Sequence, residues 1–230
     1  MTVSYRIRCM LLSCAAIVPA LQLSAVAEPA LIGPILHSAV IQREIPVPLR
    51  GSAVPGSRVL IEMAGVKMAT QADKDGAWRA EVPAMRVGGP YTLSIQDSSG
   101  TSRYDDILVG DVILCSGQSN MEFPVYRALN PDRVIASAEN PEIRLMTIPQ
   151  VTSITPLEAL PEGAVWEGAT SETVRDFSAV CYLSGKALQE DSGVPLGLID
   201  ASWGGSQIEA WLSAEDLEHV GGFSAQLEQL

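Results

Sequence analysis

The sequence predicts a multi-domain fold in which an all-β sandwich is followed by an α/β domain. Short alternating runs separated by turn residues fill the region from 31 to about 105, and that pattern is typical of an antiparallel sandwich. An unbroken apolar run then begins at Val112, as in a strand of a parallel sheet buried on both faces. A helical segment and another apolar run follow, and this order indicates parallel strands joined by a crossover. We expect a signal peptide over 1–27, the sandwich over 28–105 and the α/β domain over 106–230.

The first 27 residues have the pattern of a secretory signal peptide. Arg6 and Arg8 form a basic region, an apolar stretch follows, and residues 25–27 (AVA) give the small-x-small cleavage pattern. A membrane anchor is the competing interpretation, but Pro19 and Gln22 interrupt the stretch. We therefore expect an exported chain, periplasmic or extracellular, that is free of the membrane after cleavage.

The net charge of −12 at pH 7 argues against a nucleic-acid partner, because phosphates attract Lys and Arg. Two cysteines remain outside the leader. Cys115 falls in the apolar run and Cys181 in a predicted helix, so we expect two buried free thiols rather than a disulfide. The spacing of cysteines and histidines predicts no metal site. The oligomeric state is not predicted.

Within the predicted sandwich, residues 59–63 and 91–95 alternate with period two, as in strands with one buried face. Glycine, proline and aspartate clusters separate these runs and predict turns. Trp78 has two interpretations, a platform for a sugar or a core residue, and the core is favoured. His37 receives no predicted role.

The α/β region contains two further predicted strands, a loop and a helix. The strands are residues 142–148 and 196–202, residues 149–172 form a long loop, and residues 176–191 form a helix ended by Gly193. The helix is expected to bury Phe177, Val180, Cys181 and Leu188 along one side.

Two predicted strands end in small polar residues. Ser119 follows the apolar run, with Gly117 allowing a sharp turn, and ligands of α/β sheets bind at the carboxyl ends of strands. Gly204 and Gly205 follow the last strand. Ser206 and Glu209 are then expected to form a capping box at the start of a helix. A second short helix is expected at Ser213 and Asp216.

A serine beside backbone N–H groups supplies a nucleophile and donors for a developing oxyanion. Taken alone, a serine is more often structural. Longer blocks, however, carry a resemblance. The segments 110–122 (GDVILCSGQSNME), 196–211 (LGLIDASWGGSQIEAW) and 177–182 (FSAVCY) resemble blocks of the sialate O-acetylesterase family within the SGNH hydrolases. Residues 40–43 (VIQR), 75–78 (DGAW) and 89–93 (GPYTL) are similar to recurrent phrases of its β-module.

The resemblance implies a sandwich of immunoglobulin-like or jelly-roll type before an incomplete, flavodoxin-like, three-layer SGNH domain. It also implies a carboxylic ester hydrolase that removes O-acetyl groups from sugars or glycans through an acyl-enzyme, without metal or organic cofactor. Ser119 would be the nucleophile. Its own N–H and that of either Gly204 or Gly205 would form the oxyanion hole, and the choice stays open. Substrate contacts are expected from Gln118, Asn120 and Trp203.

Other residues near these blocks have competing interpretations. Glu209 would serve as a triad acid, but the capping box explains it without catalysis. Trp203 and Trp211 would contact sugar or pack against the protein. His219 follows Asp216 with Asp-x-x-His spacing, which we interpret as a chance match within a predicted helix.

A WYQGE-like segment and a carboxyl-terminal Asp-x-x-His segment of the family are not found in the sequence. A serine hydroxyl needs a base to be nucleophilic near neutral pH. We therefore expect a truncated product or a fragment of a longer chain, with little esterase activity of its own. The alternative is a non-catalytic glycan-binding or interaction protein built on the sandwich.

Overall fold

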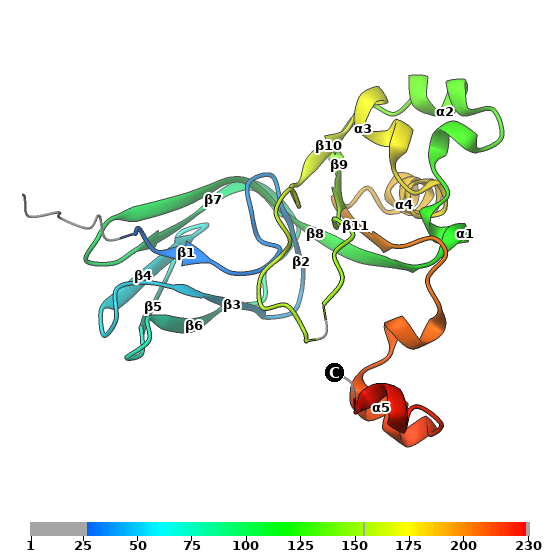
Figure 1. Ribbon diagram of the computed structural model, residues 1–230. Helices are drawn as coiled ribbons and strands as arrows, with labels where there is room; N and C mark the ends of the chain where they lie inside the picture. Colours follow the sequence, from blue (N-terminus) through cyan, green and yellow to red (C-terminus); the bar gives the residue numbers. More distant parts are fainter. Residues whose placement is uncertain (1–26, 154, 229–230) are drawn as a thin grey trace, which may run out of the picture.

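A computed structural model describes residues 27–153 and 155–228 (Figure 1). The predicted signal peptide lies almost entirely outside the described residues. Eight strands precede the first helix: β1 (Ala30–Leu31), β2 (Val40–Gln42), β3 (Val47–Ser52), β4 (Arg58–Met63), β5 (Val66–Gln71), β6 (Ala77–Val82), β7 (Gly88–Gln96) and β8 (Thr101–Gly117). After β8 come α1 (Ser119–Glu122), the 3-10 helix η1 (Val125–Arg127), α2 (Pro131–Ala136), β9 (Asn140–Thr147), β10 (Glu167–Ala169), α3 (Ser171–Asp176), α4 (Ala179–Ser192), β11 (Leu196–Ser202), the 3-10 helix η2 (Ile208–Trp211), α5 (Ala214–Val220) and α6 (Ser224–Leu227).

The strands form two sheets. A small antiparallel sheet has the order β1-β3-β6, and a large mixed sheet has the order β10-β9-β11-β8-β7-β4-β5, with β2 paired to β8. β11 is parallel to both β8 and β9, as the strand–helix–strand order predicts. The architecture is therefore mostly β, with a mixed sheet and several helices.

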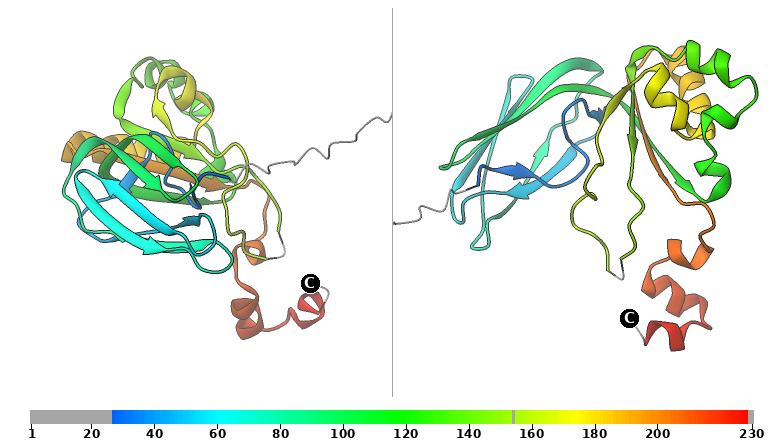
Figure 2. Two further views of the ribbon diagram at one scale, coloured as in Figure 1. Left: turned by 90° about the vertical axis from the view of Figure 1, so that its left-hand side faces the viewer. Right: turned by 45° about the horizontal axis from the view of Figure 1, so that its top comes forward.

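One long strand joins the two halves of the molecule. The amino-terminal part of β8 pairs antiparallel with β7, and its carboxyl-terminal part pairs parallel with β11. Figure 2 shows β8 running without interruption from the β-rich half to the helices. The predicted boundary between residues 105 and 106 falls inside this strand, so the domain bounds stay a prediction.

Each half has its own apolar core. In the β-rich half, alternating residues of β4 and β7 are buried together with Trp78, whose exposure of 2% confirms the core interpretation. In the other half, Ile143, Leu198 and Tyr182 pack between the parallel strands and α4. Burial of these side chains is the main stabilising contribution to both halves.

The helical region corrects several predictions. α4 starts at Ala179 and ends at Gly193, which adopts the left-handed conformation as expected. Val180 and Leu188, however, are 48% and 54% exposed. The helix instead buries the side that carries Cys181, Tyr182 and Gln189, and Gly185 on the same side allows Leu198 to approach closely. The predicted loop 149–172 contains β10 and the start of α3.

The prediction of two free thiols is wrong, because Cys115 and Cys181 form a disulfide. Both residues were expected to be buried, and both are. Pairing follows because Cys115 of β8 points toward the face that α4 covers, where Cys181 lies with a Cα–Cα distance of 5.9 Å. The sequence pattern predicted that each cysteine is buried, but not on which face of its strand or helix it lies.

The expected burial of β8 on both faces is also wrong. Ile113 and Cys115 face the core beneath α4, whereas Leu114 on the opposite face is 64% exposed. Figure 1 shows α1 to α4 gathered on one side of β8, β9 and β11. The three-layer arrangement implied by the resemblance is therefore seen only as two layers in the described part of the chain.

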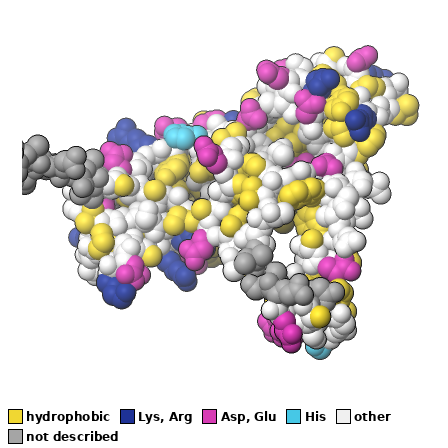
Figure 3. Space-filling model, viewed as in Figure 1, with side chains coloured by type: hydrophobic (Ala, Val, Ile, Leu, Met, Phe, Trp, Pro, Cys, Tyr) yellow, Lys and Arg dark blue, Asp and Glu magenta, His cyan; other side chains and the backbone are white. Residues whose placement is uncertain are grey.

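None of the described helices is long and apolar enough to cross a membrane. On the face of the molecule seen in Figure 3, acidic and basic side chains are scattered among apolar ones.

Candidate active site

The first turn of the site follows β8. Gly117 ends the strand with φ of +146°, a backbone conformation that side chains disfavour. Ser119 then begins α1 without a side-chain cap from Gln118. Ser119 is exposed, and its Oγ lies 3.4 Å from Gln118 Oε1, to which it donates. The hydroxyl is therefore accessible from solvent at the carboxyl end of a sheet strand.

The second turn follows β11 and lies against the first. Ser202 is the register partner of Gly117, and the N–H of Trp203 donates to the Gly117 carbonyl at 2.9 Å. A Cβ atom placed on Gly204 would lie 3.7 Å from Ser119 Cα. The chain thus brings the serine and the glycine pair together, as expected for the ends of two neighbouring parallel strands.

The two glycines differ in what their N–H groups bind. The Gly204 N–H donates to Glu122 Oε2 at 2.8 Å. Within residues 27–153 and 155–228, neither the Gly205 N–H nor the Ser119 N–H donates a hydrogen bond. Gly205 has φ of +79°, which favours glycine. In this conformation Gly205 and Ser119 hold the unoccupied backbone donors.

Glu122 and Gln150 join the two turns and were missed by sequence reasoning. The Glu122 carboxylate accepts hydrogen bonds from Gly204 N–H and, at 2.6 Å through Oε1, from Gln150 Nε2. Gln150 Nε2 also lies 3.3 Å from the Ser202 carbonyl. A Cβ on Gly204 would overlap the Glu122 carboxylate. The one signal in the sequence is that Glu122 ends the GQSNME block.

A buried acid lies beneath the glycine turn. Asp200 of β11 is only 6% exposed and accepts a hydrogen bond from Ser202 Oγ at 2.6 Å. Burial raises the pKa of Asp200, the bonds from Ser202 oppose this rise, and the charge of Glu122 adds to it. The strand pattern gave no reason to single out this residue.

The predicted capping box is wrong. The helix after the glycines is the short η2, which begins at Ile208 without a side-chain cap. Ser206 Oγ instead donates to the Trp203 carbonyl at 2.7 Å and accepts from Trp211 Nε1 at 2.8 Å. The tight turn points the Ser206 side chain back toward Trp203. In this position its hydroxyl holds the indole of Trp211 in place. The second expected cap is confirmed, since Ser213 caps α5 by accepting from Asp216 N–H.

A cavity of about 640 Å³ opens beside the glycine turn. Its walls include Trp203, Gly204, Gly205 and Trp211 together with the loop after β9. Gln118 lines a smaller cavity of about 240 Å³, which shares Ser206 and Trp211 with the first. Asn120 is exposed at the surface. Of the three predicted substrate contacts, Trp203 and Gln118 therefore border cavities.

The described histidines lie away from the hydroxyl. His37 Nδ1 accepts from the Asp105 N–H at 3.1 Å in the β-rich half, and His219 lies in α5. Among the described residues, neither one hydrogen-bonds to Ser119, and Glu209 makes no side-chain bond to it. The same part of the chain contains no group of three or more residues suited to hold a metal ion.

The chain resembles known proteins in both sequence and fold. No family model matches the chain. The chain is 32% identical over 188 residues to human sialate O-acetylesterase and 31% identical to the mouse protein. The match covers 74% of this chain, but the chain spans only about a third of these relatives, 36% and 35% of their lengths.

A solved structure gives the same result. A carbohydrate acetylesterase from Xanthomonas citri superimposes with a TM-score of 0.80 at 36% identity. The alignment covers 83% of this chain and 43% of that one. Sequence and fold therefore agree over nearly all of the described residues. The chain belongs to the sialate O-acetylesterase family.

Proposed function

We propose that this chain carries the nucleophile of a serine esterase that removes O-acetyl groups from carbohydrates. The activities of its relatives support this proposal, although the chain spans only about a third of the curated ones. The observation that carries it is the position of an exposed Ser119 against the turn at Gly204. A hydroxyl and free backbone N–H groups converge there, as acyl transfer requires.

In this mechanism Ser119 Oγ attacks the carbonyl carbon of the acetyl ester. The carbonyl oxygen becomes negative and accepts hydrogen bonds from the N–H groups of Ser119 and Gly205, which have no other partner among the described residues. The bond to the sugar oxygen breaks, the sugar leaves as an alcohol, and water then hydrolyses the acetyl-serine. Gly204 is assigned a different role, because its N–H is bound to Glu122.

The proton of Ser119 needs an acceptor during the attack. Among the described residues no histidine hydrogen-bonds to Ser119, so this proposal assigns the base to no residue of that part of the chain. The 230-residue chain alone should then hydrolyse esters only slowly. This proposal includes a finer layout, with a sandwich over 28–105 and an incomplete SGNH domain over 106–230, and export to the periplasm or the extracellular space.

An acetylated sugar would occupy the cavity that contains Trp203 and Trp211. Trp211 is held by Ser206, so its ring is in a fixed place for stacking on the apolar face of a sugar. Gln118 and Asn120 lie on the nucleophile turn and would donate hydrogen bonds to sugar hydroxyls. This arrangement places the acetyl group between the two turns and the sugar ring in the cavity beside Trp203 and Trp211.

The test measures hydrolysis of p-nitrophenyl acetate and of an O-acetylated sialic acid by the full chain. We expect a slow rate that Ser119→Ala abolishes. The matched control is Ser98→Ala, which removes an exposed hydroxyl in the β7–β8 turn and should leave the rate unchanged. A rate that is insensitive to Ser119→Ala would contradict the proposal. Glycan binding without any serine-dependent hydrolysis would favour the alternative, a non-catalytic glycan-binding protein.

A further inference from the structure

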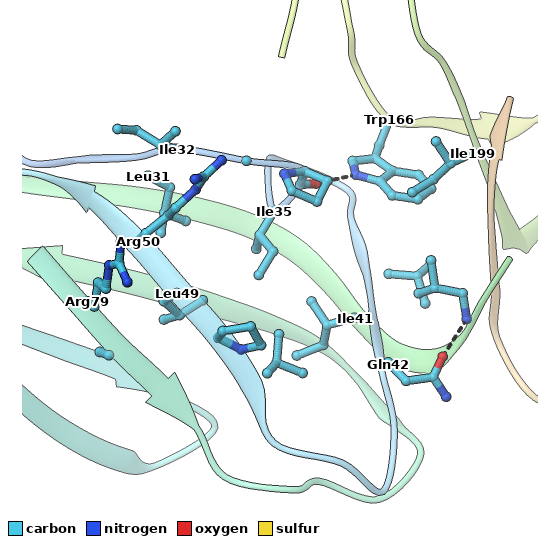
Figure 4. Close-up of a pocket in the computed structure, with 17 residues that line it drawn as sticks. Leu31, Ile32, Ile35, Ile41, Gln42, Leu49, Arg50, Arg79, Trp166 and Ile199 are labelled. Carbon is cyan, nitrogen blue, oxygen red and sulfur yellow. Dashed lines mark hydrogen bonds between the residues drawn. The ribbon is translucent and has the colours of Figure 1, made fainter. Parts of the chain in front are cut away.

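A second cavity lies between the two halves of the molecule, away from Ser119. Its volume is about 560 Å³, within the range of small-molecule sites. The β-rich half contributes β3, β6 and the segment from β1 to β2, and the other half contributes β8, β11 and the residue before β10. Figure 4 shows aliphatic side chains along the cavity, with Trp166 and Ile199 at one end and Arg50 and Arg79 at the other.

Away from the two arginines, the cavity offers few free polar groups. Trp166 Nε1 donates to the Pro34 carbonyl at 2.7 Å. Gln42 Oε1 accepts from the Val112 N–H at 2.9 Å, and Gln42 Nε2 donates to Asp111 Oδ1 at 3.1 Å. A sugar would lose its hydrogen bonds to water there without replacement. An aliphatic chain loses none, and it gains from leaving water.

The polar end of the cavity carries two positive charges. Arg50 of β3 and Arg79 of β6 are register partners on neighbouring antiparallel strands, and both line the cavity. Arg50 donates one hydrogen bond to the Glu158 carbonyl. Within the described residues neither arginine forms an ion pair. Like charges opposite one another on a sheet are destabilising, and an anion between them would relieve the repulsion.

We propose that this cavity binds a medium-chain aliphatic carboxylate. The hydrocarbon chain would lie among the aliphatic walls, and the carboxylate would accept hydrogen bonds from Arg50 and Arg79. This proposal is independent of the proposed esterase activity, since the cavity and its residues are separate from Ser119. A ligand there would contact both halves of the molecule at once.

Isothermal titration calorimetry of the full chain tests the proposal, with decanoate and its neutral counterpart decanol below their aggregation limits. Both arginines are exposed, and two ion pairs at exposed sites predict that decanoate binds roughly fivefold more tightly than decanol. The variant Arg50→Ala/Arg79→Ala should bind both ligands alike. The matched control, Arg58→Ala/Arg86→Ala, removes two exposed arginines that do not line the cavity and should keep the preference. Circular dichroism checks the fold of each variant.

Two further measurements locate the ligand and its source. Ile199→Trp, which adds bulk to the far end, should weaken both ligands by at least about tenfold. The protein should not co-sediment with vesicles of phosphatidylglycerol, because the cavity admits one hydrocarbon chain and not a membrane surface. Absence of decanoate binding, equal affinity for decanoate and decanol in the unmodified chain, or sedimentation with vesicles alone would each overturn the proposal.

Discussion

The two turns that meet at the candidate active site are built in opposite ways. The turn after β8 is open: Ser119 is exposed, and its N–H has no partner among the described residues. The turn after β11 is held at several points, through Glu122 on Gly204, Ser202 on Asp200 and Ser206 on Trp211. This difference separates the group that reacts from the groups that fix the geometry, and fixed donors are what oxyanion stabilisation needs.

The largest expected effect concerns the anchoring of β8. Its strand is bonded covalently to α4 through Cys115 and Cys181, whereas β11 is held by hydrogen bonds and by the packing of Leu196 and Leu198. The variant Cys115→Ser/Cys181→Ser should lose about 2–4 kcal/mol of unfolding free energy, since the disulfide restricts the unfolded chain. Urea denaturation of the oxidised protein and the variant measures the loss. Equal midpoints for the two would contradict the disulfide.

The second prediction compares the two glycines. In Gly204→Ala the added Cβ would overlap the Glu122 carboxylate, and overpacking of this kind costs about 1–3 kcal/mol. In Gly205→Ala the Cβ meets nothing within 4 Å, but φ is +79°, which costs about 1–2 kcal/mol. Adding the change Glu122→Ala should rescue Gly204→Ala and leave Gly205→Ala unrescued. Thermal unfolding of the single and double variants measures this, and equal rescue of both would contradict the assigned contact.

The third prediction tests the link between the turns. Glu122→Ala should remove the acceptor of the Gly204 N–H, with a loss of about 1 kcal/mol for a partly exposed bond to a charged group. Hydrogen exchange of the Gly204 amide should become faster, whereas exchange in β4 should not change. Glu122→Gln retains a carbonyl acceptor and should retain most of the protection. Unchanged exchange at Gly204 in Glu122→Ala would rule out the link.

The smallest effect concerns Asp200, whose pKa in the folded protein is raised mainly by burial. The folded state therefore favours the neutral acid. The stability difference between Asp200→Asn and the unmodified protein should be near zero below the unfolded pKa of about 3.9. As the pH rises above that value and through the pKa of Asp200 in the folded protein, Asp200→Asn should become increasingly more stable than the unmodified protein. Thermal melts between pH 3 and pH 8 measure this, and a trend of the opposite sign would contradict it.

The sequence predicted the strands better than their faces. Residues 196–202 form β11 as expected, because a continuous apolar run bounded by Gly193 and a glycine pair has few other interpretations. Leu114 and Val180 were expected to be buried but are exposed, since an apolar residue does not reveal which face of its strand or helix another element covers. The pairing of Cys115 with Cys181 was missed for the same reason.

Within the site, sequence reasoning found the residues that lie at the ends of predicted strands. It missed the residues whose positions depend on contacts between distant parts of the sequence. Ser119 and Gly204 each end a predicted parallel strand, so their proximity followed from topology. Glu122 and Gly204 are separated by 82 positions, and Gln150 reaches the same carboxylate from a loop. Such bonds depend on the closure of the fold, and no local pattern announces them.

The central claim is that the Ser119 hydroxyl and the glycine turn act as one acyl-transfer site. The most direct measurement is phosphonylation by a fluorophosphonate, with the modified residue located by mass spectrometry. We predict slow labelling at Ser119, because no described residue acts as its base, no labelling in Ser119→Ala, and still slower labelling in Gly205→Ala than in the Ser98→Ala control. Labelling at a different serine, or a rate at Ser119 that the glycine substitution leaves unchanged, would contradict the claim.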